Sequence, residues 1–245
     1  MSIETVSSLW VGGRISTLQR LCMRSFLAHG HRFELYTYDD IPGLSQGVSR
    51  LDASLILPRR RIFKHMDSYA AFSDLFRYRL LRDRGGCWAD LDMVCLRKFD
   101  FEGDYVFCSE RKKSVGTGVN TGVIKVSRAN THFARELYWR ALFRRARTRL
   151  QRKNPLGWVA LGPELMGRVV ARIKLIHCVM PPDSFCPIDW FDIGVLFSPD
   201  RTVNLSGSYA IHLWDSMWLR RGFDLDGQYD PNSLIEKLKQ QYGVK

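Results

Sequence analysis

The feature that most constrains the fold of this chain is the segment Gly85-Gly86-Cys87-Trp88-Ala89-Asp90-Leu91-Asp92. Apolar residues at a helical spacing precede it over 68–84, and an apolar, strand-like run follows it at 93–96. Because side chains alternate along an extended chain, we expect Asp90 and Asp92 to point to the same side. Two carboxylates held in this way suit Mg²⁺ or Mn²⁺, with phosphate oxygens and water completing the coordination shell.

The order of the remaining segments predicts an α/β fold. The chain starts with a strand at 4–11, a helix over 15–27 and a second strand at 33–38, and Ser16 with Gln19 forms a capping-box pattern. A strand–helix–strand start is typical of a parallel sheet. Further strands are expected at 105–109, 121–126, 175–179 and 209–214, and helices at 133–150, from Pro163 and at 234–242.

The length of the chain and its glycines add two expectations. A chain of 245 residues without a repeat or linker suits one domain with a full core, so we predict a single domain over 1–245. Gly116, Gly118 and Gly122 predict a loop that a ligand can approach closely.

Composition narrows the class of protein. Hydrophobic residues make up 45% of the chain and aromatic residues 12%, which indicates a globular protein. The sequence contains neither an apolar run long enough for a transmembrane helix nor the pattern of a signal peptide. The six cysteines lack Cys-x-x-Cys spacing, so we expect reduced thiols and a cytoplasmic location.

The net charge of +12 indicates an anionic partner: nucleic acid, lipid headgroups or a phosphorylated substrate. The segment Arg135–Lys153 holds eight basic residues and one acidic residue. This segment either contacts an anionic membrane or is the solvated side of a helix. The apolar positions of that helix should face the core: Phe133, Leu137, Ala141, Leu142, Ala146 and Leu150. We favour the anionic contact, which would place the protein on the inner face of a membrane.

The pattern Ser73-Asp74-x-x-Arg77, followed by Gly85-Gly86-x-Trp88-x-Asp90-x-Asp92, resembles the DXD-containing sugar-nucleotide glycosyltransferases. This family includes bacterial capsule and lipopolysaccharide transferases, α-1,4-galactosyltransferases, initiating α-mannosyltransferases and the catalytic domains of large glucosylating toxins. Shorter motifs carry the resemblance over nearly the whole chain: Leu9-Trp10-Val11-Gly12-Gly13, Asn120-Thr121-Gly122-Val123, Gly162-Pro163 and His212-x-Trp214.

The resemblance implies a GT-A fold, which is a Rossmann-like mixed sheet flanked by helices. It also implies a metal-dependent transfer of a hexose from a nucleotide sugar, with UDP-hexose as the foremost donor and Mn²⁺ or Mg²⁺ as the cofactor. The implied reaction retains the anomeric configuration and gives an α linkage. The implied acceptor is a glycan or a lipid-linked glycan in surface polysaccharide synthesis.

Roles for individual residues follow from the resemblance. Asp92, Asp90 and His212 would hold the metal, and Asp90, Asp92 and Asn120 would act in catalysis, with Asn120 binding the transferred sugar. The donor would be bound by Trp10, Asp74, Arg77, Trp88, Asp90, Gly162 and Trp214, with Trp10 stacking on the base and Trp214 closing over the leaving group. The residues do not single out a nucleophile, and the candidates are Glu110, Asn120, Glu164 and Asp215.

Three other hypotheses compete with a glycan-directed transferase. The first is a basic nucleic-acid-binding protein; no helix–turn–helix, zinc-finger or RNA-binding aromatic pattern supports it, and we expect no specific nucleic acid. The second is a related transferase that modifies a protein acceptor. The third is a non-catalytic relative acting as a scaffold, against which the intact Asp74, Arg77, Asp90, Asp92 and Asn120 argue.

Overall fold

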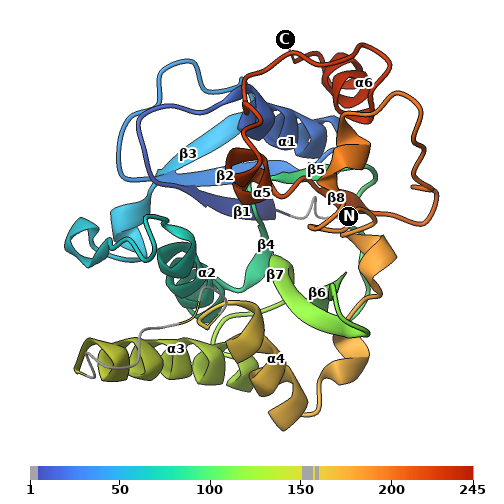
Figure 1. The fold of residues 1–245 in the computed structure, drawn as a ribbon. Helices are drawn as coiled ribbons and strands as arrows, with labels where there is room; N and C mark the ends of the chain where they lie inside the picture. Colours follow the sequence, from blue (N-terminus) through green and yellow to red (C-terminus); the bar gives the residue numbers. More distant parts are fainter. Residues whose placement is uncertain (1–4, 151–156, 158–159, 245) are drawn as a thin grey trace.

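A six-stranded sheet forms the centre of the protein in the computed structural model, which describes residues 5–150, 157 and 160–244 apart from the side chains of 148–150 (Figure 1). The strand order is β3-β2-β1-β4-β7-β6. These strands are β1 (Thr5–Trp10), β2 (Arg32–Thr37), β3 (Val48–Asp52), β4 (Gly86–Ala89), β6 (Tyr105–Arg111) and β7 (Thr117–Val126). A separate two-stranded sheet joins β5 (Met93–Cys95) to β8 (Ala210–His212).

The central sheet is mixed, as expected. Strand β1 pairs in parallel with β2 and β4, and β2 pairs in parallel with β3. Strand β7 runs antiparallel to both β4 and β6. The predicted α/β class and the parallel strand–helix–strand start are therefore confirmed. Glu4, the first residue of the predicted strand, lies outside the described residues.

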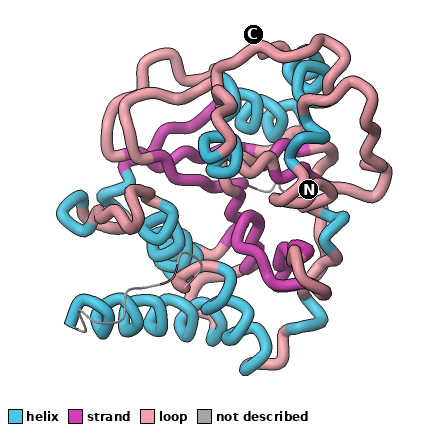
Figure 2. Tube along the Cα trace, viewed as in Figure 1, coloured by secondary structure: helices cyan, strands magenta, loops and turns pink. Residues whose placement is uncertain are grey.

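Helices cover both faces of the sheet, as Figures 1 and 2 show. Helices α1 (Thr17–Ala28), α5 (Asp215–Arg220) and α6 (Leu234–Gln241) share one core cluster with β5 and β8. Helices α2 (Ala70–Arg84), α3 (His132–Leu150) and α4 (Pro163–Arg172) pack in a second cluster. The period-two alternation of strands separates the clusters, because Cys87 and Ala89 face the first and Trp88 faces the second.

Local signals fix the element ends that matter for the site. The backbone N–H of Ser16 donates to Gln19 Oε1 at 3.2 Å, which completes the predicted start of α1. Gly85 ends α2 at φ +68°, and a Cβ added to it would lie 2.6 Å from the carbonyl carbon of Arg128. Only glycine fits this close approach, which turns the chain directly from α2 into β4.

Three predictions about elements are wrong. Residues 175–179 do not form a strand, because Ile176–Cys178 is a 3₁₀ turn that Lys174 enters at φ +60°. Gly118 and Gly122 lie within β7 rather than in a loop, and Gly116 alone lies in the turn between β6 and β7. Ala146 is exposed on α3 instead of facing the core.

Two elements were not predicted, β3 and α5. Most side chains of β3 are exposed or half-buried, so this edge strand lacks an apolar pattern. Helix α5 spans only six residues, too few to show a helical period. All six cysteines are free, and no described helix is long and apolar enough to cross a membrane.

Candidate active site

The two aspartates lie on a turn, not on an extended strand as predicted. The backbone N–H of Met93 donates to the carbonyl of Asp90 at 3.1 Å and closes a turn over 90–93. This turn leads the chain out of the central sheet, at the end of β4, into β5 of the small sheet. The two carboxylates nevertheless come together, because the turn folds Asp92 back beside Asp90.

The small sheet supplies the third member of this group. Strand β8 pairs with β5 so that His212 stands opposite Met93, next to Asp92. One ligand atom from each of Asp90, Asp92 and His212 lies within 4.8 Å of the others. Two carboxylates and one imidazole are a donor set that suits Mn²⁺ or Mg²⁺, so the residues fit the expected metal.

A hydrogen bond links two of these potential ligands. Nε2 of His212 lies 3.1 Å from Oδ2 of Asp92, and both side chains are buried. Burial lowers the pKa of His212, but the carboxylates of Asp92, Asp90 and Glu110 outweigh it and leave the pKa raised. Burial raises the pKa of Asp92, and the contact with His212 more than reverses this effect. The contact between His212 and Asp92 thus offsets the burial of both groups, at a position where a cation could also bind.

His212 is held on its other sides by Trp214 and Cys186. The Trp214 ring stacks on the imidazole with a centroid distance of 3.6 Å, and its backbone adopts φ +59°. Left-handed backbone is unusual for tryptophan and is often found at functional sites. Sγ of Cys186 lies 3.6 Å from Nδ1 of His212, which directs Nε2 towards Asp92.

Arg77 is committed to the protein rather than left open towards a ligand. Its guanidinium lies 3.0 Å from Oδ1 of Asp90 and donates to the carbonyl of Thr121 at 2.7 Å. Asp74, three residues earlier on α2, lies 3.5 Å from Nε of Arg77. The Asp74–Arg77 pair is buried, with side chains 9% and 5% exposed, so it is not the surface ion pair that the spacing alone allows.

Trp88 acts on Asp90 from inside the core. Its side chain is completely buried, and its indole N–H donates to Oδ1 of Asp90 at 2.9 Å. Arg77 lies over the same ring at 4.9 Å from the centroid. Trp88 therefore orients a carboxylate, and its contact with the donor stays a prediction.

Gly162 touches a site residue. It precedes α4, and a Cβ added to it would lie 2.7 Å from Oδ2 of Asp74. Burial raises the pKa of Asp74 to about 6; Arg77 opposes this shift and Asp90 adds to it. The glycine thus makes space for a buried carboxylate on the neighbouring helix.

Asn120 forms a bridge close to His212. Its amide donates to Oε2 of Glu110 at 2.6 Å, and its carbonyl oxygen accepts from the backbone N–H of Gly122 at 2.6 Å. Burial raises the pKa of Glu110. A Cβ at Gly122 would lie 2.8 Å from Oδ1 of Asn120 and 3.4 Å from Cε1 of His212, which explains a glycine inside β7.

Trp10 is the last residue of β1, and Asp90 directly follows β4. Both lie at the same edge of the sheet, because these two strands are parallel neighbours. Its ring is half-buried, and its indole N–H donates to the carbonyl of Arg14 at 2.9 Å. Carboxyl ends of parallel strands are the usual place for nucleotides in sheets of this kind.

The structure therefore gathers most of the predicted residues in one connected group. The contacts described above link nine of them: Asp74, Arg77, Trp88, Asp90, Asp92, Asn120, Gly162, His212 and Trp214. Trp10 is connected to this group only through its strand. Asp215 belongs to the group as well, because its backbone N–H donates to Oδ2 of Asp92 at 3.1 Å. Glu164 does not, since it pairs with Arg144 and Arg168.

Sequence analysis missed Cys186 and the carbonyl of Thr121, which hold His212 and Arg77. Cys186 lies in an irregular stretch rich in proline and aromatic residues, where no periodic pattern indicates what it contacts. Thr121 was visible only as part of the Asn120–Val123 motif.

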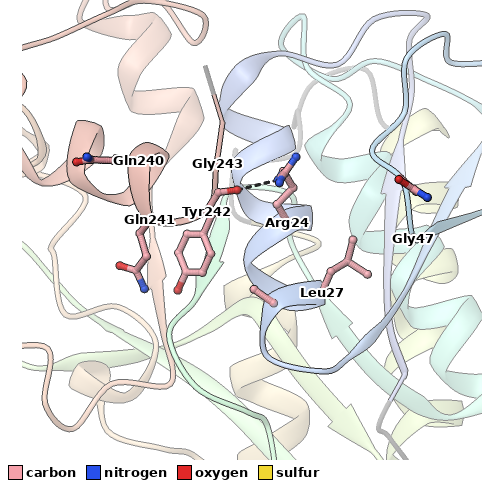
Figure 3. A pocket seen from close by; sticks show the side chains of 9 residues that line it. Arg24, Leu27, Gly47, Gln240, Gln241, Tyr242 and Gly243 are labelled. Carbon is pink, nitrogen blue, oxygen red and sulfur yellow. Dashed lines mark hydrogen bonds between the residues drawn. The ribbon is translucent and has the colours of Figure 1, made fainter.

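A separate surface hollow of about 600 Å³ lies elsewhere, between α1 and the chain after α6 (Figure 3). Its lining includes Arg24, Leu27 and Tyr242, and Arg24 Nε donates to the Tyr242 carbonyl at 2.7 Å. It contains none of the predicted site residues and carries no acidic group. Nothing in its chemistry connects it with the Asp90–Asp92–His212 group.

Two family models match consecutive parts of the chain. The model described as "Glycosyltransferase sugar-binding region containing DXD motif" matches residues 34–109. The model described as "Alpha 1,4-glycosyltransferase conserved region" matches residues 148–244. Together they cover more than half of the chain and include both aspartates, His212 and Trp214. No curated protein sequence matches the chain.

Solved structures of glycosyltransferases are also similar. The PaToxG glycosyltransferase is 14% identical over 98% of this chain and 84% of its own, with a TM-score of 0.49. The apo form of the glycosyltransferase GlyE from Streptococcus pneumoniae TIGR4 is 14% identical over 99% of this chain and 64% of its own, with a TM-score of 0.47. The galactosyltransferase LgtC, solved with donor and acceptor sugar analogues, is 12% identical over 68% of this chain and 70% of its own, with a TM-score of 0.40.

The mixed sheet with helices on both faces and the paired aspartates at a strand end agree with the glycosyltransferase class that both family models describe. The chain is thus a glycosyltransferase whose residues 34–109 match the DXD-containing sugar-binding region, in agreement with the resemblance seen in its sequence.

Proposed function

We propose that the protein transfers a hexose from a nucleotide sugar, foremost a UDP-hexose, with the help of Mn²⁺ or Mg²⁺ held by Asp92, Asp90 and His212. The observation that carries this proposal is the convergence of three ligand atoms within 4.8 Å at the end of β4. His212 joins the two aspartates from a distant part of the chain, which distinguishes the group from a chance Asp-x-Asp in a solvated turn.

The cation would supply electrophilic assistance to the departing diphosphate. The protein's own residues keep the ligands in position: Arg77 and Trp88 hold Asp90, while Trp214 and Cys186 hold His212. Trp10 would stack on the base, and Asp74 and Gly162 would border the sugar side of the site. Trp214, 8% exposed, would also shield the leaving group from water.

For the reacting carbon, we propose the pair of Glu110 and Asn120. Their 2.6 Å hydrogen bond supports this choice, as does the position of Asn120 beside Gly122 and His212. Glu164 is the weakest of the four candidates because two arginines already bind it. The amide nitrogen of Asn120 carries two N–H groups. One donates to Glu110, and the other would donate to a sugar hydroxyl.

The acceptor that we propose is a glycan or lipid-linked glycan in surface polysaccharide synthesis, joined through an α linkage with retention. The match to a region described for α1,4-glycosyltransferases supports the α linkage. We also propose a single domain over 1–245 and a cytoplasmic, peripheral membrane location.

A donor-hydrolysis screen tests the proposal without an acceptor. Purified protein with Mn²⁺ would be incubated with UDP-galactose, UDP-glucose, UDP-N-acetylhexosamines and GDP-mannose, and nucleotide release measured. We expect nucleotide release from one UDP-hexose, and EDTA or Asp92→Ala should abolish this release. The control variant Asp104→Ala, at an exposed position, should leave it unchanged. Release that survives Asp92→Ala would contradict the assignment of the metal site.

A further inference from the structure

Helix α3 turns two large aromatic side chains towards solvent. Trp139 is 58% exposed and Phe143, one turn later, is 70% exposed. The opposite side of the helix is apolar and buried, with Phe133, Leu137 and Ala141 in the core. Trp139 and Phe143 thus lie outside the apolar side with which α3 packs, although Arg82 lies 5.6 Å from the centroid of the Trp139 ring.

Exposed arginines flank this aromatic pair on the same helix. The spacing of 135, 139, 143 and 146 places these exposed positions in one stripe, and Arg140 and Arg147 border it. The stripe therefore holds two aromatic rings, with Arg135 at one end and Arg140 and Arg147 along its border. Glu136 and Glu164 also lie on this surface and pair with arginines, so the basic residues are in excess of the acidic ones, and the two large rings distinguish it from an ordinary solvated helix face.

Helix α4 extends the same surface. It runs antiparallel to α3, because Arg144 pairs with Glu164 at 3.2 Å near one end and Arg172 approaches Glu136 at 4.0 Å near the other. Arg168 and Arg172 on α4 remain 62% and 64% exposed in their side chains. We use the name α3 face for the described side chains of this surface: Arg135, Trp139, Arg140, Phe143, Arg147, Arg168 and Arg172.

We propose that the α3 face binds the surface of an anionic lipid bilayer, with Trp139 and Phe143 entering the headgroup region. Aromatic rings on a helix lying in the plane of a membrane gain from burial, and the surrounding arginines gain from anionic headgroups. The net charge of +12 adds a long-range attraction of the same sign. This inference deepens the proposed function and rests on it for the lipid-linked acceptor.

The α3 face is connected to the site through two helices. Helix α2, which carries Asp74 and Arg77, packs directly against α3. Helix α4 begins next to Gly162, which touches Asp74, and its first turn pairs with α3 through Glu164 and Arg144. Figure 1 shows α3 along the lower edge of the molecule, below α2 and beside α4. Binding through this face would hold the enzyme at the membrane without covering the ends of β1 and β4.

Vesicle sedimentation tests the inference. The full-length protein would be mixed with vesicles of phosphatidylcholine alone and with vesicles that also contain phosphatidylglycerol. We expect binding to the anionic vesicles only, weakened about tenfold by Trp139→Ser with Phe143→Ser. Replacing Arg135, Arg140 and Arg147 by glutamine should weaken it by about a hundredfold, which is roughly fivefold for each basic residue near the surface.

Matched controls separate this face from general stickiness and charge. Leu55→Ser with Met66→Ser removes two apolar side chains of similar exposure, 68% and 63%. Glutamine in place of Arg50, Arg128 and Arg201 removes the same charge from other exposed positions. Unchanged vesicle binding by the Trp139/Phe143 variant, or an equal loss in the apolar control, would overturn the proposal. Binding to duplex nucleic acid that displaces the vesicles would overturn it as well.

Donor hydrolysis measured on the same samples separates this inference from the proposed function. Hydrolysis without vesicle binding would refute the membrane surface and leave the transferase intact. Vesicle binding that depends on the α3 face, without hydrolysis of any donor, would support the surface and refute the function.

Discussion

The space beside Asp74 is kept open by Gly162, where an added Cβ would lie 2.7 Å from the carboxylate oxygen Oδ2. We predict that Gly162→Ala displaces Asp74 and, through it, Arg77. Overpacking of a close-fitting site costs about 1–3 kcal/mol in the free energy of unfolding. Donor hydrolysis should fall as well, since Asp90 depends on Arg77. Gly194→Ala is the matched control, because a Cβ there meets no atom within 4 Å. Equal stability and hydrolysis for the two variants would contradict the prediction.

The hydrogen bond from Trp88 to Asp90 leads to a second prediction. Trp88→Phe keeps an aromatic ring in the core but removes the donor that lies 2.9 Å from Oδ1. We expect a loss of stability of about 1–3 kcal/mol, because the half-buried carboxyl group of Asp90 loses a partner, and a larger relative loss of donor hydrolysis. Trp218→Phe provides the comparison, since that buried indole donates to the carbonyl of Leu213 at 2.7 Å. Similar hydrolysis rates in the two variants would show that Trp88 does not position the site.

Cys186 is predicted to position His212 rather than to react. Cys186→Ala removes the group 3.6 Å from Nδ1, so the imidazole should orient less well and bind Mn²⁺ about 10–100-fold more weakly. Cys186→Ser should recover part of the affinity, because a hydroxyl can also hydrogen-bond the ring. Calorimetric titration with Mn²⁺ measures this, with Cys178→Ala as the control at a half-buried position. Equal affinity in the alanine and serine variants would indicate a packing role only.

The pKa of Asp74 predicts how stability depends on pH. Burial raises this pKa from 3.8 to about 6, so the folded protein binds the proton more tightly than the unfolded chain does. The contribution of Asp74 to stability is therefore present at low pH and is lost as pH rises from about 4 to about 6, by roughly 3 kcal/mol. Asp215, raised to about 7, changes in the same direction.

Urea unfolding of wild type and Asp74→Asn across this pH range measures the effect. The difference in unfolding free energy between the two proteins isolates Asp74, because Asp215 is present in both. We expect the variant to gain on wild type as pH rises. A difference independent of pH would contradict the raised pKa.

Much of the fold could be predicted from the sequence, because its local patterns are strong. The apolar period of α1 and α2, the capping pattern at Ser16 and the glycines after Arg84 predicted elements that the structure contains. The edge strand β3 could not be predicted, since its exposed residues show no alternation. The false strand at 175–179 arose from apolar residues of which none is buried: Ile176 is exposed in a 3₁₀ turn, and Val179 alone forms an isolated bridge, to Phe107.

The sequence predicted which residues form the site better than it predicted how they are arranged. The motif identified Asp90 and Asp92, but their approach depends on a turn and not on strand alternation. His212 approaches the aspartates because β5 pairs with β8. These strands lie more than a hundred positions apart, so no local sequence pattern indicates that they pair. The contacts that bind Arg77 and Cys186 into the site are tertiary for the same reason.

The central claim, a cation between the paired aspartates and a nucleotide diphosphate, is tested most directly by calorimetric titration of UDP with Mn²⁺ present. We predict UDP binding that EDTA abolishes. Asp92→Asn should abolish it while the protein stays folded, and Asp104→Asn should leave it unchanged. UDP binding of equal strength in wild type and Asp92→Asn, or binding indifferent to EDTA, would contradict this claim.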